Sequence, residues 1–390
     1  MTDRTATTFL DYREARAQAR RRLPRGVFEY IDRGTEAETA VSHNRARFDA
    51  LRVVPRVLAG GAARDLSADY LGTHRELPFI MAPTAFSGMV RHRGDIALSR
   101  AARSRGLPFC VATEGLLSID EIAAASPAEH WFQIYLWTGE ENWRPLLARA
   151  RDAGVEILVM TIDTPVYPKR TFNQHNGFGL PLRYGPRNIA DVLSRPLWAA
   201  DVLGRALVSG GLPRFAHHPR AAEAPITGRG VPPMTHQAGL NWDHVAKVRA
   251  AWKGKLLLKG ILHPDDARRA VSEGADGVIV SSHGMRNLDI SVAPLDMLPA
   301  LRKALGDNTT ILADSGVQRG SDVFKLLHAG ADAVLLGRAM LYGLASGGQA
   351  GVQAMVDILA DELDCTMAMC GCRTLADIRH ASVERDYIRK

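Results

Sequence analysis

From residue 78 onward the chain repeats one pattern, in which a short apolar run is followed by a polar tip and then by a stretch with helical periodicity. Short apolar runs bounded by glycine or polar residues are typical of strands that are buried on both faces of a parallel sheet. Eight such runs occur, at residues 78–83, 108–113, 131–136, 157–163, 256–260, 277–282, 310–316 and 333–338. Helical stretches lie between them, for example at residues 95–104, 141–152, 264–273 and 322–328.

Eight strands alternating with helices predict an α/β fold, a (β/α)8 TIM barrel. An open doubly wound sheet is the alternative, but it would more often show a GxGxxG turn after its first strand, and this sequence has none. Residues 4–50 predict amphipathic N-terminal helices with a break at Pro24, and the final helices, at residues 347–379, are expected to pack under the barrel.

One gap between strands is much longer than the others and runs from the fourth strand at residue 157 to the fifth at residue 256. It holds an insertion at residues 171–240, rich in Pro, Gly, Arg and Trp, with possible helices at residues 189–193 and 198–207. A basic segment with aromatic residues could lie on a membrane surface, but a lid or an oligomer contact is the favoured interpretation. We therefore predict a single barrel domain over residues 1–390 that contains this insertion.

Composition narrows the functional class. The chain is 46% hydrophobic and 23% charged, which is ordinary for a globular protein, and its net charge of +7 comes with no nucleic-acid motif. The four cysteines lack metal-site spacing, so we expect no metal. The N-terminus lacks a signal-peptide core and no apolar run approaches a bilayer span. We expect a cytoplasmic protein, with peripheral attachment to the inner face of the membrane as an option.

Polar residues follow every predicted strand, and in a barrel these tips meet at one mouth, where barrel enzymes place their chemistry. Glycines and arginines after the last two strands predict a phosphate site, because glycine lets backbone amides approach an anion and arginine adds charge-assisted bonds. Thr84, Gln133, Thr161 and Lys259 offer donors and acceptors for a planar polar ring. A phosphate together with a polar heterocycle indicates a mononucleotide cofactor such as FMN.

A second group of tip residues indicates the substrate. Arg170 and Arg286 suit a carboxylate, which accepts paired hydrogen bonds from guanidinium groups. His283 has the natural pKa of a base, and Asp163 could orient its ring.

These motifs resemble those of the FMN-dependent 2-hydroxy-acid oxidases and dehydrogenases, the group that acts on glycolate, lactate and mandelate. The similarity runs from about residue 10 to residue 380. The family signature, usually SNHGGRQLD, stands here as SSHGMRNLD at residues 281–289. The supporting motifs are APTAF at 82–86, WFQIY at 131–135, TIDTP at 161–165, LLKG at 257–260, ADSGVQRGSDV at 313–323 and VLLGRAMLYGLA at 334–345.

The resemblance implies oxidation of an (S)-2-hydroxy acid to the 2-oxo acid, with electrons passed to O2 or a quinone, by a homotetramer. It implies that His283 is the base and that Asp163, Tyr135, Tyr30 and Lys259 complete the catalytic set. It implies that the substrate contacts Arg170, Arg286, Tyr30, Tyr135, Glu114 and Phe86. It implies that FMN contacts Pro83, Thr84, Ala85, Thr113, Gln133, Thr161, Lys259, Ser281, Asp314, Gly316, Gln318, Arg319, Gly337 and Arg338.

Several positions depart from the family pattern. Gln318 replaces an arginine, which would weaken one phosphate contact, and Met285 replaces a small residue and would narrow the pocket. Glu114 stands where several relatives carry an aromatic residue, so it either favours a substrate with a distal hydroxyl or amine or points to solvent. Ala85 favours O2 as the acceptor, whereas the insertion resembles that of the quinone-linked dehydrogenases.

Two other functional classes are compatible with parts of the sequence. One is a non-redox FMN barrel enzyme such as an isomerase, which would not need the paired arginines. The other is a weakly catalytic module that binds a membrane surface through residues 184–220.

Overall fold

The computed structural model describes residues 9–60, 63–178, 185–209, 213–218 and 235–385. Eight parallel strands close into a barrel, as predicted, in the order β10-β11-β4-β5-β6-β7-β8-β9. Each strand lies within or next to one of the eight apolar runs. The strands are β4 (Phe79–Met81), β5 (Phe109–Ala112), β6 (His130–Ile134), β7 (Ile157–Thr161), β8 (Lys255–Ile261), β9 (Gly277–Val280), β10 (Thr310–Ala313) and β11 (Ala333–Leu336).

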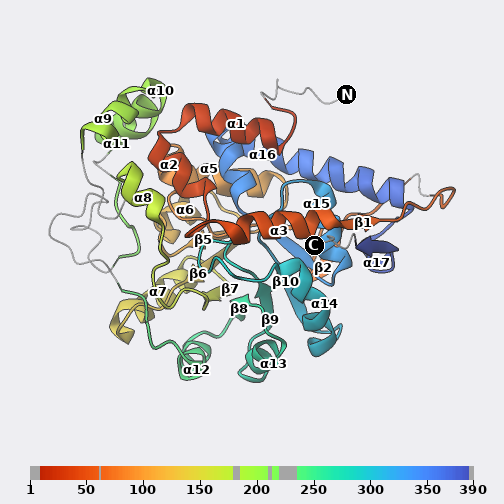
Figure 1. Cartoon of the computed structure of the whole chain (residues 1–390). Helices are drawn as coiled ribbons and strands as arrows, with labels where there is room; N and C mark the ends of the chain where they lie inside the picture. Colours follow the sequence, from red (N-terminus) through yellow and green to blue (C-terminus); the bar gives the residue numbers. More distant parts are fainter. Residues whose placement is uncertain (1–8, 61–62, 179–184, 210–212, 219–234, 386–390) are drawn as a thin grey trace.

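Eight helices form the outer ring, one after each strand. They are α5 (Gly94–Ser104), α6 (Ile119–Ala125), α7 (Glu140–Asp152), α12 (Trp242–Ala251), α13 (Pro264–Ser272), α14 (Pro294–Leu305), α15 (Gly320–His328) and α16 (Arg338–Cys370). The expectation that the final helices lie under the barrel is wrong for α16. This helix packs against α15 and α5 in the ring and against α1 (Tyr12–Arg22), as Figure 1 shows. Gly348 interrupts it with a φ of 62°, which turns the chain between its two straight parts.

The alternation of side chains along the strands explains how the barrel positions a site. Trp131, Val159, Leu257, Ile279 and Leu312 belong to one buried cluster inside the barrel. Two residues further along each strand, the same alternation places polar side chains over this core, on the C-terminal side. Those side chains are Gln133, Thr161, Lys259, Ser281 and Asp314.

The opposite end of the barrel is closed by a short hairpin of β2 (Ala68–Tyr70) and β3 (Thr73–Arg75). Tyr70 meets Trp131 edge-on at a ring distance of 6.4 Å, and the Leu71 amide donates to Thr310 Oγ1. The N-terminal helices α2 (Arg25–Asp32) and α3 (Thr39–Ala50) are present as predicted, and β1 (Leu51–Val53) pairs with β12 (Val383–Arg385). The short helices α4 (Ser87–Val90) and α17 (Leu375–Arg379) complete the scaffold.

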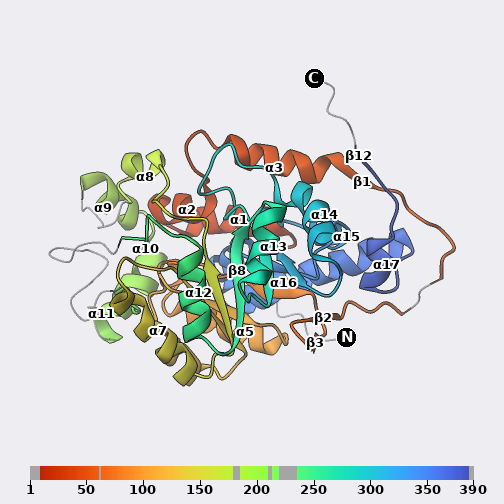
Figure 2. The same ribbon diagram turned by 90° about the horizontal axis from the view of Figure 1, so that it is seen from below.

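Residues 171–178 and 185–209 of the insertion contain helices that lie together at one edge of the molecule in both views (Figures 1 and 2). They contain α8 (Thr171–Asn176), α9 (Pro186–Leu193), α10 (Pro196–Trp198), a π-helical turn (Ala199–Gly204) and α11 (Arg205–Ser209). Trp198 fixes the group to the barrel, because its ring is buried and its Nε1 donates to Met89 O at 2.7 Å. Within the described residues, no helix combines the length and apolarity needed to cross a bilayer.

His217 anchors a second part of the insertion to the loop after β5. Its Nδ1 lies 3.1 Å from Thr113 O, and its Nε2 accepts from the Ile119 amide at 3.0 Å. Only the neutral ring with the proton on Nδ1 can make both bonds. Burial lowers the pKa of His217 from 6.5 to about 4, so the folded protein strongly favours this form.

We expect stability that depends on pH through this residue. The folded state holds His217 neutral while the unfolded chain binds a proton near pH 6.5. The contribution is therefore complete above pH 6.5 and is lost as the pH falls toward 4, by up to about 3 kcal/mol. Urea unfolding at several pH values should show this loss in the parent and a smaller one in His217→Gln. Equal pH dependence of the two proteins would contradict the assignment.

Candidate active site

A cavity of about 1260 Å³ opens at the C-terminal ends of the strands, and residues in or after the C-terminal ends of all eight strands line it. Most of the residues singled out in the sequence meet there. They are Tyr30, Pro83, Thr84, Ala85, Glu114, Gln133, Tyr135, Thr161, Arg170, Lys259, His283, Arg286, Asp314, Gly316, Gln318, Gly337 and Arg338. Glu114 thus faces this cavity, which decides between the two orientations considered for it.

Five other predicted residues are not part of the cavity wall. Asp163, Ser281 and Thr113 lie behind it and hold side chains that do line it, namely His283, Lys259 and Gln133. Phe86 is buried beneath Tyr30, at a ring distance of 4.9 Å. The side chain of Arg319 turns away and pairs with Asp49.

His283 has the geometry of a base. Its Nδ1 lies 2.9 Å from Asp163 Oδ1, and its Nε2 lies 3.2 Å from the Tyr135 hydroxyl. Burial alone would raise the pKa of Asp163, but the charge and hydrogen bond of His283 outweigh it and lower the pKa below its usual value. An ionised Asp163 holds the proton on Nδ1, which leaves Nε2 with a lone pair toward the cavity.

The backbone that carries His283 is strained. His283, Gly284 and Met285 have φ values of 56°, 65° and 61°, all in the left-handed region. A non-glycine residue in this region costs on the order of 1–3 kcal/mol, and such strain persists where the surroundings enforce it. Here Ser315 enforces it, because its Oγ accepts the amides of Ser282 and Gly284.

Arg170 and Arg286 are the two candidates for binding an anion. Both guanidinium groups approach the ring of Tyr30, at 5.8 Å for Arg170 and 4.9 Å for Arg286. Arg286 donates to the carbonyl oxygens of Tyr30 and Arg33. Burial, followed by the charge of Arg170, lowers the pKa of Arg286 to about 9. Neither arginine has an ion pair within the described ranges, so an anion between them would relieve an unfavourable arrangement of like charges.

Lys259 places a further positive charge in the barrel, and this charge, unlike those of the two arginines, has a carboxylate partner. Its Nζ donates to Ser281 Oγ at 2.8 Å and lies 3.0 Å from Asp314 Oδ2. Burial opposes its charge, yet the carboxylates of Asp314 and Asp163 raise the pKa of Lys259 above its usual value. The nearby Gln133 Nε2 is buried without a hydrogen bond in the described part of the chain. A fixed cation beside an unsatisfied donor fits a planar ring that carries acceptor atoms, as a flavin does.

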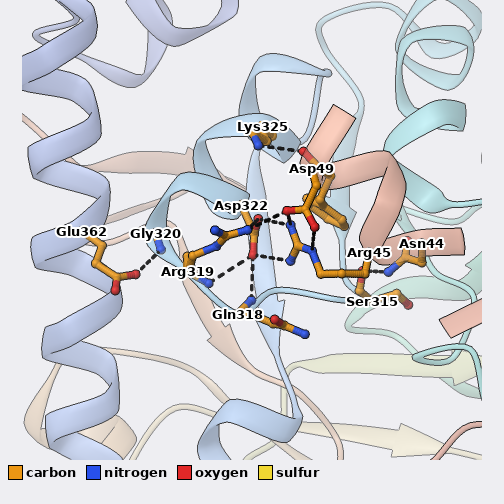
Figure 3. A network of polar contacts seen from close by, with 11 residues as sticks. Asn44, Arg45, Asp49, Ser315, Gln318, Arg319, Gly320, Asp322, Lys325 and Glu362 are labelled. Atoms are coloured by element: carbon orange, nitrogen blue, oxygen red, sulfur yellow. Dashed lines mark hydrogen bonds and ion pairs between the residues drawn. The ribbon is translucent and has the colours of Figure 1, made fainter. Parts of the chain in front are cut away.

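The loop after β10 is organised around the buried Asp322, as Figure 3 shows. Asp322 accepts the amides of Gln318 and Arg319, and both terminal nitrogens of Arg45. These two amides are therefore already occupied. Gly316, with a φ of 102°, faces Asn44 so closely that a Cβ would lie 2.2 Å from Asn44 Nδ2.

Arg338 places a cation at the start of α16. It is the first residue of α16 and lines the cavity, and three carbonyl oxygens, of Ile31, Arg33 and Gly284, hold its guanidinium. A helix N-terminus with an arginine and the adjoining Gly337 is a suitable site for a phosphate.

The cavity residues that the sequence did not identify include Thr164, Tyr167 and His236. Thr164 donates to Asp163 Oδ1, and Asn287 bonds both Thr164 and the Asp163 carbonyl. The rings of Tyr167 and His236 lie 4.6 Å apart, with their planes tilted by 31°. His236 comes from the far end of the insertion, and no spacing in the sequence relates it to the strand tips.

Comparisons with known proteins agree with this geometry. A family model described as FMN-dependent dehydrogenase matches residues 19–385. L-lactate dehydrogenase of Caulobacter vibrioides is 38% identical over 376 residues, which cover 94% of this chain and 95% of the relative. (S)-Mandelate dehydrogenase of Pseudomonas putida is 36% identical over 381 residues, covering 97% and 93%. The crystal structure of a monotopic membrane protein, (S)-mandelate dehydrogenase, superposes with a TM-score of 0.90 at 34% identity, covering 97% of this chain and 100% of that one.

Proposed function

The chain belongs to the FMN-dependent dehydrogenase family and is an FMN-dependent 2-hydroxy-acid oxidoreductase, and we propose that it oxidises an (S)-2-hydroxy acid with His283 as the base. One observation carries this assignment of roles. The cavity holds a His–Asp pair and two partly buried arginines whose guanidinium groups have no ion pair in the described ranges. That combination suits a molecule with a carboxylate next to a carbon that loses a proton.

In this proposal Arg170 and Arg286 bind the substrate carboxylate, which fixes the neighbouring hydroxyl-bearing carbon. His283 Nε2 accepts the proton that the substrate loses, and the ionised Asp163 stabilises the imidazolium that results. Burial, followed by the charges of Glu114 and Asp163, raises the pKa of Tyr135 well above its usual value. Its hydroxyl therefore stays protonated and donates to Nε2 of the neutral His283. Once the substrate takes that place at Nε2, this hydroxyl and that of Tyr30 would be hydrogen-bond donors to the substrate oxygens.

Bound FMN supplies the two-electron acceptor of the reaction. Residues after the strands would hold its ring system, namely Pro83, Thr84, Ala85, Gln133, Thr161 and Lys259. Gly316, Gly337 and Arg338 would hold its phosphate. Arg319 would contribute only after releasing Asp49, and Gln318 offers no charge. Lys259 stays cationic, and this buried ammonium would offset the negative charge that the cofactor gains.

We further propose that the insertion rests on a membrane surface and thereby favours a quinone as the electron acceptor. The apolar side chains of Ile189, Leu193, Leu197, Leu207 and Val208 are more than half exposed on α9–α11. Arginines 187, 195 and 205 lie among them along the chain. Exposed apolar residues mixed with cations are typical of segments that lie in the headgroup region of an anionic bilayer.

Purified protein should be yellow and should lose its flavin absorbance anaerobically on addition of a 2-hydroxy acid. Reoxidation by dissolved oxygen and by a soluble quinone, compared in the same cuvette, identifies the acceptor. If no member of a broad 2-hydroxy-acid panel bleaches the flavin, the proposal fails, and a non-redox use of FMN becomes the better interpretation.

Replacing His283 with glutamine should slow anaerobic flavin reduction by about 100- to 10,000-fold, because a positioned base contributes that much. The flavin spectrum should remain, since the barrel and its phosphate end are untouched. His74→Gln is the matched control, because His74 is exposed on β3 and far from the strand tips. A His283→Gln protein that reduces its flavin at the parental rate would contradict the assigned role.

Membrane contact is tested by sedimentation with vesicles that contain anionic lipid. A triple substitution of Leu193, Leu197 and Val208 by glutamate should reduce the bound fraction at low and moderate salt. The control replaces Leu58, Ile290 and Met369, which are equally exposed apolar residues outside the insertion. Equal losses in the two triple variants, or no binding by the parent, would refute contact through the insertion.

A further inference from the structure

The cavity wall includes a carboxylate that the oxidation chemistry does not require. Glu114 from the loop after β5, Tyr167 from the loop after β7 and His236 from the end of the insertion meet there. Tyr167 OH donates to Glu114 Oε1 at 3.4 Å, and His236 Nε2 lies 3.4 Å from the same oxygen. Three segments that are distant in sequence thus converge on one carboxylate.

His236 is held firmly in this wall. Its ring stacks on Tyr135 at 4.5 Å with an interplanar angle of 21°, and its Nδ1 lies 3.0 Å from Thr164 O. Because a carbonyl oxygen can only accept, Nδ1 carries a proton, and in the neutral ring Nε2 is then an acceptor. Nε2 is buried and makes no hydrogen bond with the described residues. In the neutral ring two acceptors, Nε2 and Glu114 Oε1, thus lie 3.4 Å apart, and a donor group beside them would relieve this arrangement.

The cavity wall carries groups of opposite charge. Arg170 and Arg286 supply guanidinium groups that suit the carboxylate of the substrate, whereas Glu114 supplies a carboxylate. Tyr135 contacts both regions, because its hydroxyl lies 3.2 Å from His283 Nε2 and its ring stacks on His236. A substrate that is bound by its carboxylate and reacts beside His283 therefore extends its side chain toward two hydrogen-bond acceptors.

We propose that the substrate is a 2-hydroxy acid whose side chain ends in a hydrogen-bond donor, a hydroxyl or an amino group, which Glu114 and His236 accept. This proposal rests on the proposed oxidation and adds the substrate class. A purely apolar side chain would cover Glu114 and leave its charge with only the hydrogen bond from the Tyr167 hydroxyl, and a second carboxylate would be repelled. An ammonium group has several N–H bonds and can donate to both acceptors, whereas a hydroxyl has one O–H and donates to one of them.

The magnitude of the expected preference follows from the charge of Glu114. A hydrogen bond to a charged group changes affinity by about tenfold to a hundredfold. Glu114 is partly solvated, with 21% of its side chain exposed, so the lower part of that range is expected.

The test uses pairs of substrates with the same shape that differ only in the terminal group. One pair is 4-hydroxymandelate and 4-methylmandelate, and the other is 2,6-dihydroxyhexanoate and 2-hydroxyheptanoate. 6-Amino-2-hydroxyhexanoate tests the cationic donor. Anaerobic flavin reduction gives kcat/KM for each. In at least one series the donor should be preferred over its methyl analogue by about tenfold or more.

Substitutions of Glu114 then assign the preference to this wall. Glu114→Ala should bring the ratio of kcat/KM for donor over methyl close to one. Glu114→Gln, which keeps a neutral acceptor, should retain part of the preference for a hydroxyl and lose the preference for an amine. Glu140→Gln on α7 is the control and should keep the parental ratio, because Glu140 is bound to Arg144 and Lys247 outside the cavity.

Binding without turnover separates this proposal from the proposed oxidation. The dissociation constants of 4-hydroxyphenylacetate and 4-methylphenylacetate, which lack the 2-hydroxyl, are measured on the flavin-loaded protein by calorimetry. Failure of every 2-hydroxy acid to bleach the flavin would refute the oxidation, while these constants would still report on the acidic wall. A parental preference near one in both series, or a preference that survives Glu114→Ala, would overturn the proposal.

Discussion

The compensation of buried charge at the strand ends is the constraint on which the rest of the site depends. Lys259 and Asp163 are buried, and each would lose its charge to desolvation without a partner. Asp314 compensates Lys259, and His283 compensates Asp163. Removing one member would leave the other buried and unpaired, at a cost of about 3–5 kcal/mol for a pair of this kind. The charge of Lys259 thus depends on Asp314, and the charge of Asp163 depends on His283.

Arg170 and Arg286 are the exception to this rule. Their positive charges are close enough for Arg170 to help lower the pKa of Arg286, and no carboxylate of the described residues pairs with them. The strained turn of His283 is a second local exception, because its left-handed backbone is unfavourable by itself. Both exceptions lie where a substrate would bind, and the packed core of the surrounding barrel provides the stability that tolerates them.

The parts of the structure that could be predicted from the sequence are those determined by local pattern. Each barrel strand is a short apolar run. Because alternate side chains along a strand share a face, Gln133, Lys259 and Asp314 point to the same side as the interior residues two positions before them, at the mouth of the barrel. The lining of the cavity by Gln318 followed from its place in the loop after β10. The side chain of Arg319 could not be placed in this way, because its direction depends on Asp49, which lies on another helix. The position of α16 depends on packing against α1, which no local period encodes.

His236 shows most clearly why the remainder of the site could not be predicted. It follows a long insertion whose length and composition carry no information about where its end returns to the barrel. In the folded chain this end pairs with Trp137 after β6, while His217 fixes another part of the insertion beside Glu114 after β5. The same segment that offers exposed apolar residues at the molecular edge therefore also builds one wall of the cavity. Changes in the insertion can alter the recognition of a substrate side chain while the barrel, and with it the arrangement of His283 and Asp163, stays the same.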